Sequence, residues 1–364
     1  MARGTAPASS STASSWMQRP SVRWTALLLL LVVLVLAPLQ LSEFTNQTLA
    51  RIGVFAVAVL GLNVVMGYTG QVSLGQIFFL GLGAYVTAYG VTNGWNVVLT
   101  FALACLIPAV AGLLVALAAA RLGGLAIAMV TVALPIVGVP LAKRLSDFTG
   151  GSEGMSTSFA TSPPGSGLFD DQFQLYVVLV IGGIVFLLTR SLVRGKYGRA
   201  FAIVKGNEAV ASSMGISPYR YKVLAFTIAS LIGGVSGFLY MLVIQYTSPE
   251  TMSFGHSINL VAAMVIGGSA SIVGSILGGI YYVLVPQLTN AVDPSLTALL
   301  QGAILLAVLF VLPGGLVSLP RALTRGRRRS HASRGPVAPP TTPPSTTGSG
   351  TTAEEPETER QGHA

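Results

Sequence analysis

Ten apolar segments of membrane-spanning length constrain the fold of this chain more than any other feature of its sequence. Most approach the roughly 20 apolar residues that a helix needs to cross the hydrocarbon core of a bilayer. Only 9% of the residues are charged, whereas a soluble domain carries about 25%. The sequence therefore predicts an all-α, polytopic integral membrane protein with about ten transmembrane helices. The segments are 24–41, 51–67, 73–90, 96–119, 124–142, 173–190, 223–245, 257–272, 275–289 and 296–312.

Three of these segments, 73–90, 257–272 and 275–289, are short or rich in Gly. Each is open to two interpretations: a complete span, or a broken or re-entrant element.

Small residues such as Gly233 and Gly237, four positions apart, predict close packing between helices, because a helix without bulky side chains lets another backbone approach.

The basic residues predict the orientation of the chain in the membrane. With the N-terminus in the cytoplasm and ten spans, 18 of the 21 Lys and Arg residues fall on the cytoplasmic side. Only Arg51, Lys143 and Arg144 fall on the other side. Such an asymmetry follows the positive-inside rule and predicts that both termini are cytoplasmic. It also argues against nucleic acid as a partner, despite the net charge of +9, because the charges lie in tails and connecting segments.

The two ends of the chain differ in composition from the apolar body, residues 24–319. Residues 1–23 are rich in Ser and predict a disordered cytoplasmic tail. Residues 320–364 begin with a basic run, continue with Pro, Thr and Gly, and contain four Glu near the end. We expect a disordered C-terminal tail whose basic part contacts the headgroups of anionic membrane lipid.

The sequence shows no pattern typical of an enzyme, a cofactor site or a metal site. It contains no phosphate-binding loop, and His256 is isolated from the other two histidines, which lie in the tail. Of the eight acidic residues before that tail, seven are predicted on the outer side and Glu208 on the inner side. A proton-coupled carrier usually places a titratable carboxylate within the membrane. We therefore expect energy for transport to come from another chain, with an ion-coupled secondary transporter as the weaker alternative.

A polar segment on the predicted cytoplasmic side, about 191–222, contains the signals of a short helix. Asn207 is a favourable N-cap, Glu208 suits the positive end of the helix dipole, and Gly215 is a favourable C-terminal stop. A helix of two turns is marginal in isolation, so it must gain stability by docking. Docking on the chain's own spans and docking on a cytoplasmic motor both remain open.

A second polar stretch begins at Gly67 and leads into the third apolar segment. Gln71, Ser73 and Gln76 lie at or just inside the predicted membrane boundary. Amides and hydroxyls in lipid need hydrogen-bond partners. These three side chains therefore either line a translocation pathway or form hydrogen bonds between helices.

Three stretches of the sequence resemble one family. They are GYTGQVSLGQIFFLGLGAY (67–85), GRAFAIVKGNEAVASSMGISPYRYKVLAF (198–226) and SPETMSFGHSINLVAAMVIGGSASIVGSILGG (248–279). Their order and spacing are similar to those of the branched-chain amino acid ABC transporter permeases of LivM type, over about residues 50–315. The chain departs from the usual family pattern at Gly206, where a charged residue is usual, and at Ala270, where Gly is usual.

The resemblance implies a permease subunit, located in the bacterial inner membrane, of a binding-protein-dependent importer. It implies two cytoplasmic ABC ATPase subunits, a LivH-type sister permease and an extracytoplasmic solute-binding protein as partners. It also implies that Asn207, Glu208, Ala209 and Gly215 belong to the loop that couples the permease to an ATPase. The expected substrates are branched-chain or other hydrophobic amino acids, and a urea or amide permease of the same family is the alternative.

Overall fold

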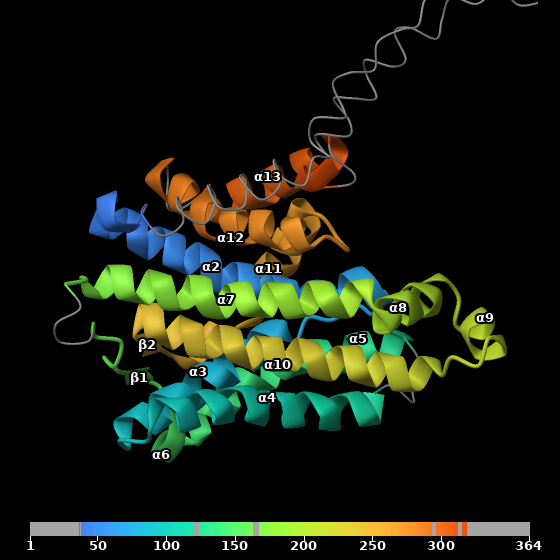
Figure 1. Cartoon of the computed structure of the whole chain (residues 1–364), viewed down its shortest axis with the longest axis horizontal. Helices are drawn as coiled ribbons and strands as arrows, with labels where there is room; N and C mark the ends of the chain where they lie inside the picture. The colour runs from blue at the N-terminus through green and yellow to red at the C-terminus, as the bar shows by residue number, and fades with distance from the viewer. Residues whose placement is uncertain are drawn as a thin grey trace, which may run out of the picture. The chain divides into compact units, whose positions relative to one another are not determined.

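The described part of the chain is almost entirely helical (Figure 1). The computed structural model describes residues 36, 38–119, 124–162, 167–292, 296–311 and 315–318. The chain divides into two compact units, Met1–Pro320 and Arg321–Ala364, and all described residues belong to the first. The longer helices are α2 (Glu43–Leu62), α3 (Gln76–Thr92), α4 (Val97–Ala119), α5 (Gly124–Arg144), α7 (Asp170–Arg194), α10 (Pro218–Ile244), α11 (Phe254–Gly267), α12 (Ile272–Val292) and α13 (Thr297–Val311).

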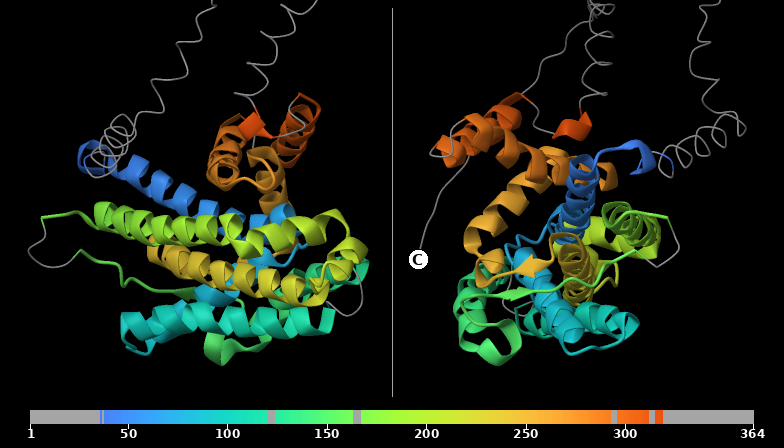
Figure 2. Two further views of the ribbon diagram at one scale, coloured as in Figure 1. Left: turned by 45° about the vertical axis from the view of Figure 1, so that its right-hand side comes forward. Right: turned by 90° about the vertical axis from the view of Figure 1, so that its left-hand side faces the viewer.

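Several shorter elements connect or extend these helices. A π-helix, η2, continues α2 directly, and α8 and α9 follow α7 (Figure 2). The only strands among the described residues form one short antiparallel pair, in which Met155 lies opposite Thr247. The shorter elements are η2 (Asn63–Tyr68), α6 (Ser146–Thr149), β1 (Met155–Ser156), α8 (Lys196–Gly206), α9 (Glu208–Ser213), β2 (Tyr246–Thr247), η3 (Pro249–Met252) and η5 (Leu316–Ser318).

The helix α10 is the centre of the bundle, and it packs against α2, α3 and α4. Close approach is achieved through glycine. A Cβ atom at Gly237 would overlap the backbone of α3 at Leu80 and Ala84, and a Cβ atom at Gly234 would overlap the backbone of α4 at Ala104. The predicted packing role of Gly237 is therefore confirmed. Dispersion between closely packed backbones stabilises helix association where the hydrophobic effect is absent.

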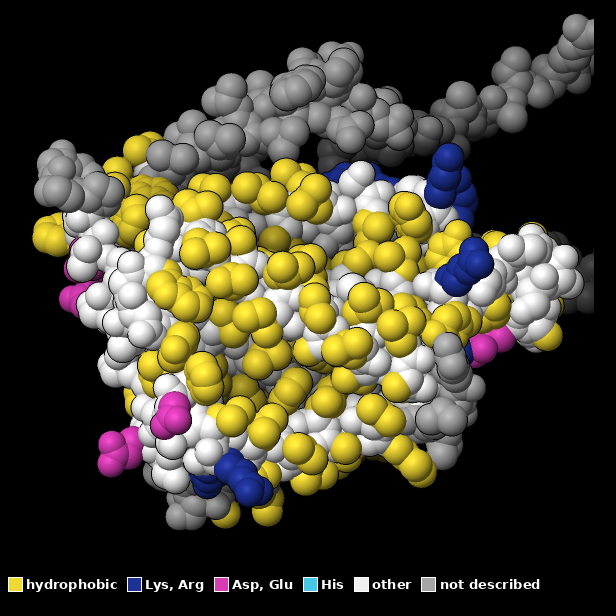
Figure 3. Space-filling model, turned by 90° about the horizontal axis from the view of Figure 1, so that it is seen from below, with side chains coloured by type: hydrophobic (Ala, Val, Ile, Leu, Met, Phe, Trp, Pro, Cys, Tyr) yellow, Lys and Arg dark blue, Asp and Glu magenta, His cyan; other side chains and the backbone are white. Residues whose placement is uncertain are grey.

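Six helical segments are long and apolar enough to cross a membrane, and three shorter apolar helices accompany them in the described part of the chain. These nine helices fall on nine of the ten predicted segments. The remaining segment, 24–41, lies almost entirely outside the described residues, as do both predicted tails. The number ten therefore stays a prediction. Hydrophobic side chains cover the middle of one face, and charged side chains gather toward its ends (Figure 3).

The two ends of the bundle carry different elements (Figure 1). One end carries α8 and α9, and we refer to it as the loop end. The opposite end carries the β1–β2 pair and is referred to as the strand end. The helix α7 reaches α8 at the loop end, and α10 leads from the loop end to β2.

Two breaks interrupt the helices within the bundle. After η2, residues 70–75 are not helical, and α3 begins only at Gln76. The helix α11 ends at Gly267 after 14 residues, and α12 begins at Ile272. Both α11 and α3, which has 17 residues, are shorter than a typical span.

Candidate transport site

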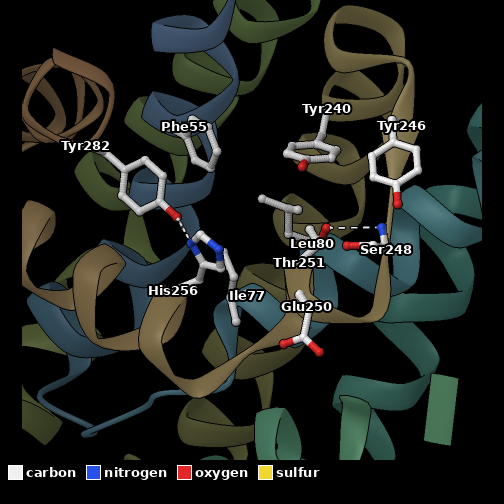
Figure 4. A pocket seen from close by; sticks show the side chains of 10 residues that line it. All are labelled: Phe55, Ile77, Leu80, Tyr240, Tyr246, Ser248, Glu250, Thr251, His256 and Tyr282. Atoms are coloured by element: carbon white, nitrogen blue, oxygen red, sulfur yellow. Dashed lines mark hydrogen bonds between the residues drawn. The ribbon is translucent and has the colours of Figure 1, made fainter. Parts of the chain in front are cut away.

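A cavity of about 210 Å³ lies toward the strand end of the bundle, where five helices and the segment after β2 meet (Figure 4). We refer to it as the aromatic cavity. Its mainly apolar walls with a few polar groups are typical of a site for a small molecule. It is lined by Phe55, Ile77, Leu80, Tyr240, Tyr246, Ser248, Glu250, Thr251, His256 and Tyr282.

Three aromatic rings form the apolar wall of the aromatic cavity. Phe55 of α2 stacks on Tyr282 of α12, with ring centroids 4.1 Å apart. Phe55 also meets Tyr240 of α10 edge to face at 6.2 Å. Such pairs hold rings in defined positions, because offset and edge-to-face geometries are favoured. The wall therefore joins three helices that are far apart in the sequence.

Polar and charged groups complete the aromatic cavity. The His256 Nδ1 atom lies 3.0 Å from the Tyr282 hydroxyl, and the two form a hydrogen bond (Figure 4). Glu250 forms an ion pair of 3.2 Å with Lys143 of α5. Arg51 precedes Phe55 by one turn on the same face of α2, and its buried Nε has no hydrogen-bond partner among the described residues. Charges of both signs thus lie near the apolar wall.

A second cavity of about 290 Å³ adjoins the first, and we refer to it as the amide cavity. His256 and Tyr282 line both cavities. The remaining lining residues are Asn259, Tyr281, Pro286, Asn290 and Gln301, from α11, α12 and α13. The hydrogen bond between His256 and Tyr282 therefore lies at the boundary between the two cavities.

The three residues predicted from sequence as candidates for pathway lining are buried near the break before α3. The Gln76 amide donates to the Ala229 carbonyl of α10 at 3.0 Å, and the Gln71 amide donates to the Thr69 hydroxyl at 2.8 Å. The Ser73 hydroxyl accepts a hydrogen bond from the nearby Gly75 N–H. Ile77, which follows Gln76 in α3, lines the aromatic cavity. A hydrogen bond to another helix, α10, is thus observed for Gln76 and, at 3.4 Å to the Lys222 carbonyl, for Gln71, whereas the hydrogen bond of Ser73 is local. A pathway role stays a prediction.

Sequence reasoning did not single out the aromatic wall. Phe55, Tyr240 and Tyr282 lie on three apolar helices and look like ordinary membrane-facing or packing residues in the sequence. In the sequence, His256 stands out only as an isolated histidine at a predicted outer boundary of the membrane. That isolation was the one available signal, because a polar side chain in an apolar helix usually has a functional or structural partner.

At the loop end, the predicted short helix is present as α9. The Asn207 side chain accepts hydrogen bonds from the N–H groups of Ala209 at 2.8 Å and Val210 at 3.2 Å. Gly215 has a φ of +77°, and the Ile216 N–H donates to the Ala211 carbonyl at 2.9 Å. This arrangement is a Schellman motif, which favours glycine at the left-handed position.

Two lysines connect the loop-end helices to the bundle. Lys222 of α10 forms an ion pair of 2.5 Å with Glu208 of α9. The Lys222 side chain is only 6% exposed, whereas that of Glu208 is 56% exposed. Lys205 of α8 donates to the Gly67 carbonyl of η2 at 2.6 Å. The loop is therefore fastened to two different helices of the bundle.

The described residues contain no group of three or more His, Cys, Asp or Glu side chains that could hold a metal ion.

A multi-pass helical body, a cavity within it and a polar loop fastened to its helices define the class of protein. These features are those of a multi-pass helical membrane protein. Comparison with known proteins specifies the family.

The family model described as the branched-chain amino acid transport system / permease component matches residues 44–309. The chain belongs to this family. The high-affinity branched-chain amino acid transport system permease protein LivM of Salmonella typhimurium is 29% identical over 324 residues, which cover 81% of this chain and 75% of the relative.

More distant similarity extends to sugar permeases. The ribose import permease protein RbsC of Escherichia coli is 26% identical over 268 residues, which cover 69% of this chain and 80% of the relative. For comparison, the LivM protein of Escherichia coli is 28% identical over 323 residues, which cover 81% of this chain and 75% of that relative. No solved structure matches the chain.

Proposed function

We propose that the chain forms half of the transmembrane pathway of a binding-protein-dependent ABC importer for branched-chain or other hydrophobic amino acids. The observation that carries this proposal is the presence of two separate sites in one helical body. The aromatic cavity lies toward the strand end, and the docking loop lies at the loop end. An importer driven by partner ATPases needs both, connected by helices that change arrangement.

The loop end is the cytoplasmic side in this proposal. Seven Lys and Arg residues in the segment 190–222 support this orientation under the positive-inside rule. Val210 of α9 and Met214, which caps the C-terminal end of α9, are exposed apolar side chains, while Ala211 is fully buried against the chain. An exposed apolar patch on a solvated helix is typical of a docking surface. The partner there is one of two cytoplasmic ABC ATPase subunits, and Asn207, Glu208, Ala209 and Gly215 shape the coupling helix.

The strand end faces the extracytoplasmic side, where a solute-binding protein delivers the substrate. A LivH-type sister permease completes the pathway. The body is embedded in the inner membrane with both termini in the cytoplasm.

The lining of the aromatic cavity favours an amino acid over a sugar. Its wall of Phe55, Tyr240 and Tyr282 suits an aliphatic side chain, because burial of apolar surface is favourable. Glu250 lines the cavity, and Arg51 lies one turn before Phe55 on α2 outside that lining, so charges of opposite sign near the wall suit the ammonium and carboxylate groups of a zwitterion. A ribose molecule has neither an aliphatic side chain nor a charge. Urea, the alternative substrate, also lacks both.

Reconstitution of the complete complex in proteoliposomes tests the proposal. With the binding protein outside and ATP inside, labelled leucine should accumulate, and unlabelled isoleucine or valine should compete. Urea and ribose at the same concentration should not compete. Accumulation of urea or ribose in preference to leucine would refute the assigned substrate class.

A further inference from the structure

Asn63, a buried residue at the start of η2, binds the turn that separates α11 from α12. Its side chain is 0% exposed. The Asn63 amide donates to the Ser271 carbonyl at 2.8 Å and to the Ser275 hydroxyl at 3.1 Å. The Ala270 N–H donates to the Asn63 Oδ1 atom at 2.7 Å. Both ends of this amide are therefore used to hold a turn that lies more than 200 residues away in the sequence.

The turn held by Asn63 has a strained backbone. Ala270 has a φ of +56°, a left-handed conformation that costs a residue with a Cβ atom more than it costs glycine. The hydrogen bond from the Ala270 N–H to Asn63 offsets this strain, so the turn depends on Asn63 more than a glycine turn would.

Gly67 of η2 allows the α11–α12 turn to lie close to the loop end. A Cβ atom at Gly67 would lie 2.6 Å from the Ala270 nitrogen and would overlap the Asn63 side chain. The absence of a Cβ atom therefore permits the contact between Asn63 and Ala270. The Gly67 carbonyl accepts the hydrogen bond from Lys205 of α8. One π-helical turn thus contacts α8 on one side and the α11–α12 turn on the other, and π-helical turns are frequent at functional sites.

The two helices that meet at this turn also form the boundary of the aromatic cavity. His256 lies near the start of α11, and Tyr282 lies on α12. Their mutual hydrogen bond closes the hairpin at its other end. A shift of the turn relative to η2 would therefore move both residues that separate the aromatic cavity from the amide cavity.

We propose that Asn63 is a positioning residue that connects the coupling loop, through Lys205 and Gly67, to the α11–α12 hairpin and so to the aromatic cavity. Movement of α8 by an ATPase displaces η2, and Asn63 carries that displacement to the turn at 268–271. This mechanism rests on the proposed function as an ATP-driven importer, while the contact itself does not depend on it.

Two variants interrupt this connection at different points. Asn63→Leu removes the hydrogen bonds to the turn with little change in size. Lys205→Met removes the hydrogen bond to Gly67 and changes an exposed residue. Lys205→Arg is the matched control, because arginine retains a donor for the Gly67 carbonyl. Adding Ala270→Gly to Asn63→Leu relieves the backbone strain at position 270 and so offsets part of the stability lost with the hydrogen bonds.

The first measurement is hydrogen exchange on the purified full-length chain, and it requires no transport. Asn63→Leu should accelerate exchange of the amides at 270–275 at least about tenfold, because loss of one buried hydrogen bond alone produces about that factor and Asn63 makes three to the turn. Unchanged exchange would overturn the role of Asn63 as the residue that holds the turn.

The second measurement is the number of leucine molecules imported per ATP hydrolysed by the reconstituted complex. Lys205→Met, and Asn63→Leu combined with Ala270→Gly, should each lower this ratio several-fold while ATPase subunits still co-purify, and Lys205→Arg should retain it. An unchanged ratio in either of the first two variants would overturn the proposal. Failure of the unmodified complex to import would refute the proposed function instead, and the exchange measurement would still decide the contact.

Discussion

The ion pair between Glu208 and Lys222 allows a prediction about the coupling helix that depends on burial. Removing Glu208 with Glu208→Gln leaves the Lys222 ammonium, 6% exposed, without its anionic partner. Removing Lys222 with Lys222→Met leaves Glu208, 56% exposed, where water can solvate the carboxylate. A buried unpaired charge costs far more than an exposed one. We therefore expect Glu208→Gln to be much the more damaging of the two.

The size of the effect follows from the geometry. A hydrogen bond to a charged group contributes about 1.5–3 kcal/mol to stability. Because the Glu208 side chain is about half exposed, the larger free energies of fully buried ion pairs do not apply to this pair. A loss of this size lowers the population of docked α9 about 10- to 150-fold. Because α9 has only six residues and one buried side chain, Ala211, few other contacts compensate.

The assay is hydrogen exchange of the amides at 208–214 in the full-length chain in lipid nanodiscs. Glu208→Gln should accelerate exchange strongly, Lys222→Met weakly, and the double variant should resemble Lys222→Met, because no buried charge remains. Equal effects of the two single variants, or a larger effect of Lys222→Met, would refute the reasoning from burial.

Three further predictions concern other parts of the chain. Ala209→Trp on the exposed face of α9 should reduce leucine uptake at least tenfold while membrane insertion is unchanged; normal uptake with normal ATPase binding would contradict the docking role. Deletion of 330–364 should leave uptake nearly intact, and a large loss would show that the tail takes part in transport. Gly237→Ala should lower the free energy of unfolding by about 1–3 kcal/mol through overpacking, whereas Gly183→Ala, which meets nothing within 4 Å, should not; thermal unfolding in detergent compares the two, and equal midpoints would contradict the packing argument.

Those parts of the fold that depend on local sequence were predictable. Apolar length located nine helices, because the bilayer sets the length of a span. The helix α9 was located to within a residue, because Asn207 and Gly215 satisfy its ends locally. The start of α2 at Glu43, eight residues before the predicted segment, was missed. Ser42 caps it by accepting from the Thr45 N–H, a signal that hydropathy does not register.

The aromatic cavity and the role of Asn63 were not predictable, because both depend on contacts between distant segments. The cavity wall combines Phe55, Tyr240 and Tyr282 from three helices, and no spacing in the sequence indicates that they meet. Asn63 lies in an otherwise apolar segment, and its partners lie beyond residue 268. Local patterns report helices and caps, whereas tertiary packing alone decides which polar side chains find each other.

The source of energy for transport is the central claim, and one measurement tests it most directly. Leucine uptake is compared between proteoliposomes that contain the complete complex with ATP inside and proteoliposomes that contain this chain alone with an imposed sodium or pH gradient. The account predicts accumulation in the first and none in the second. Concentration of leucine by the chain alone, driven by an ion gradient, would contradict it.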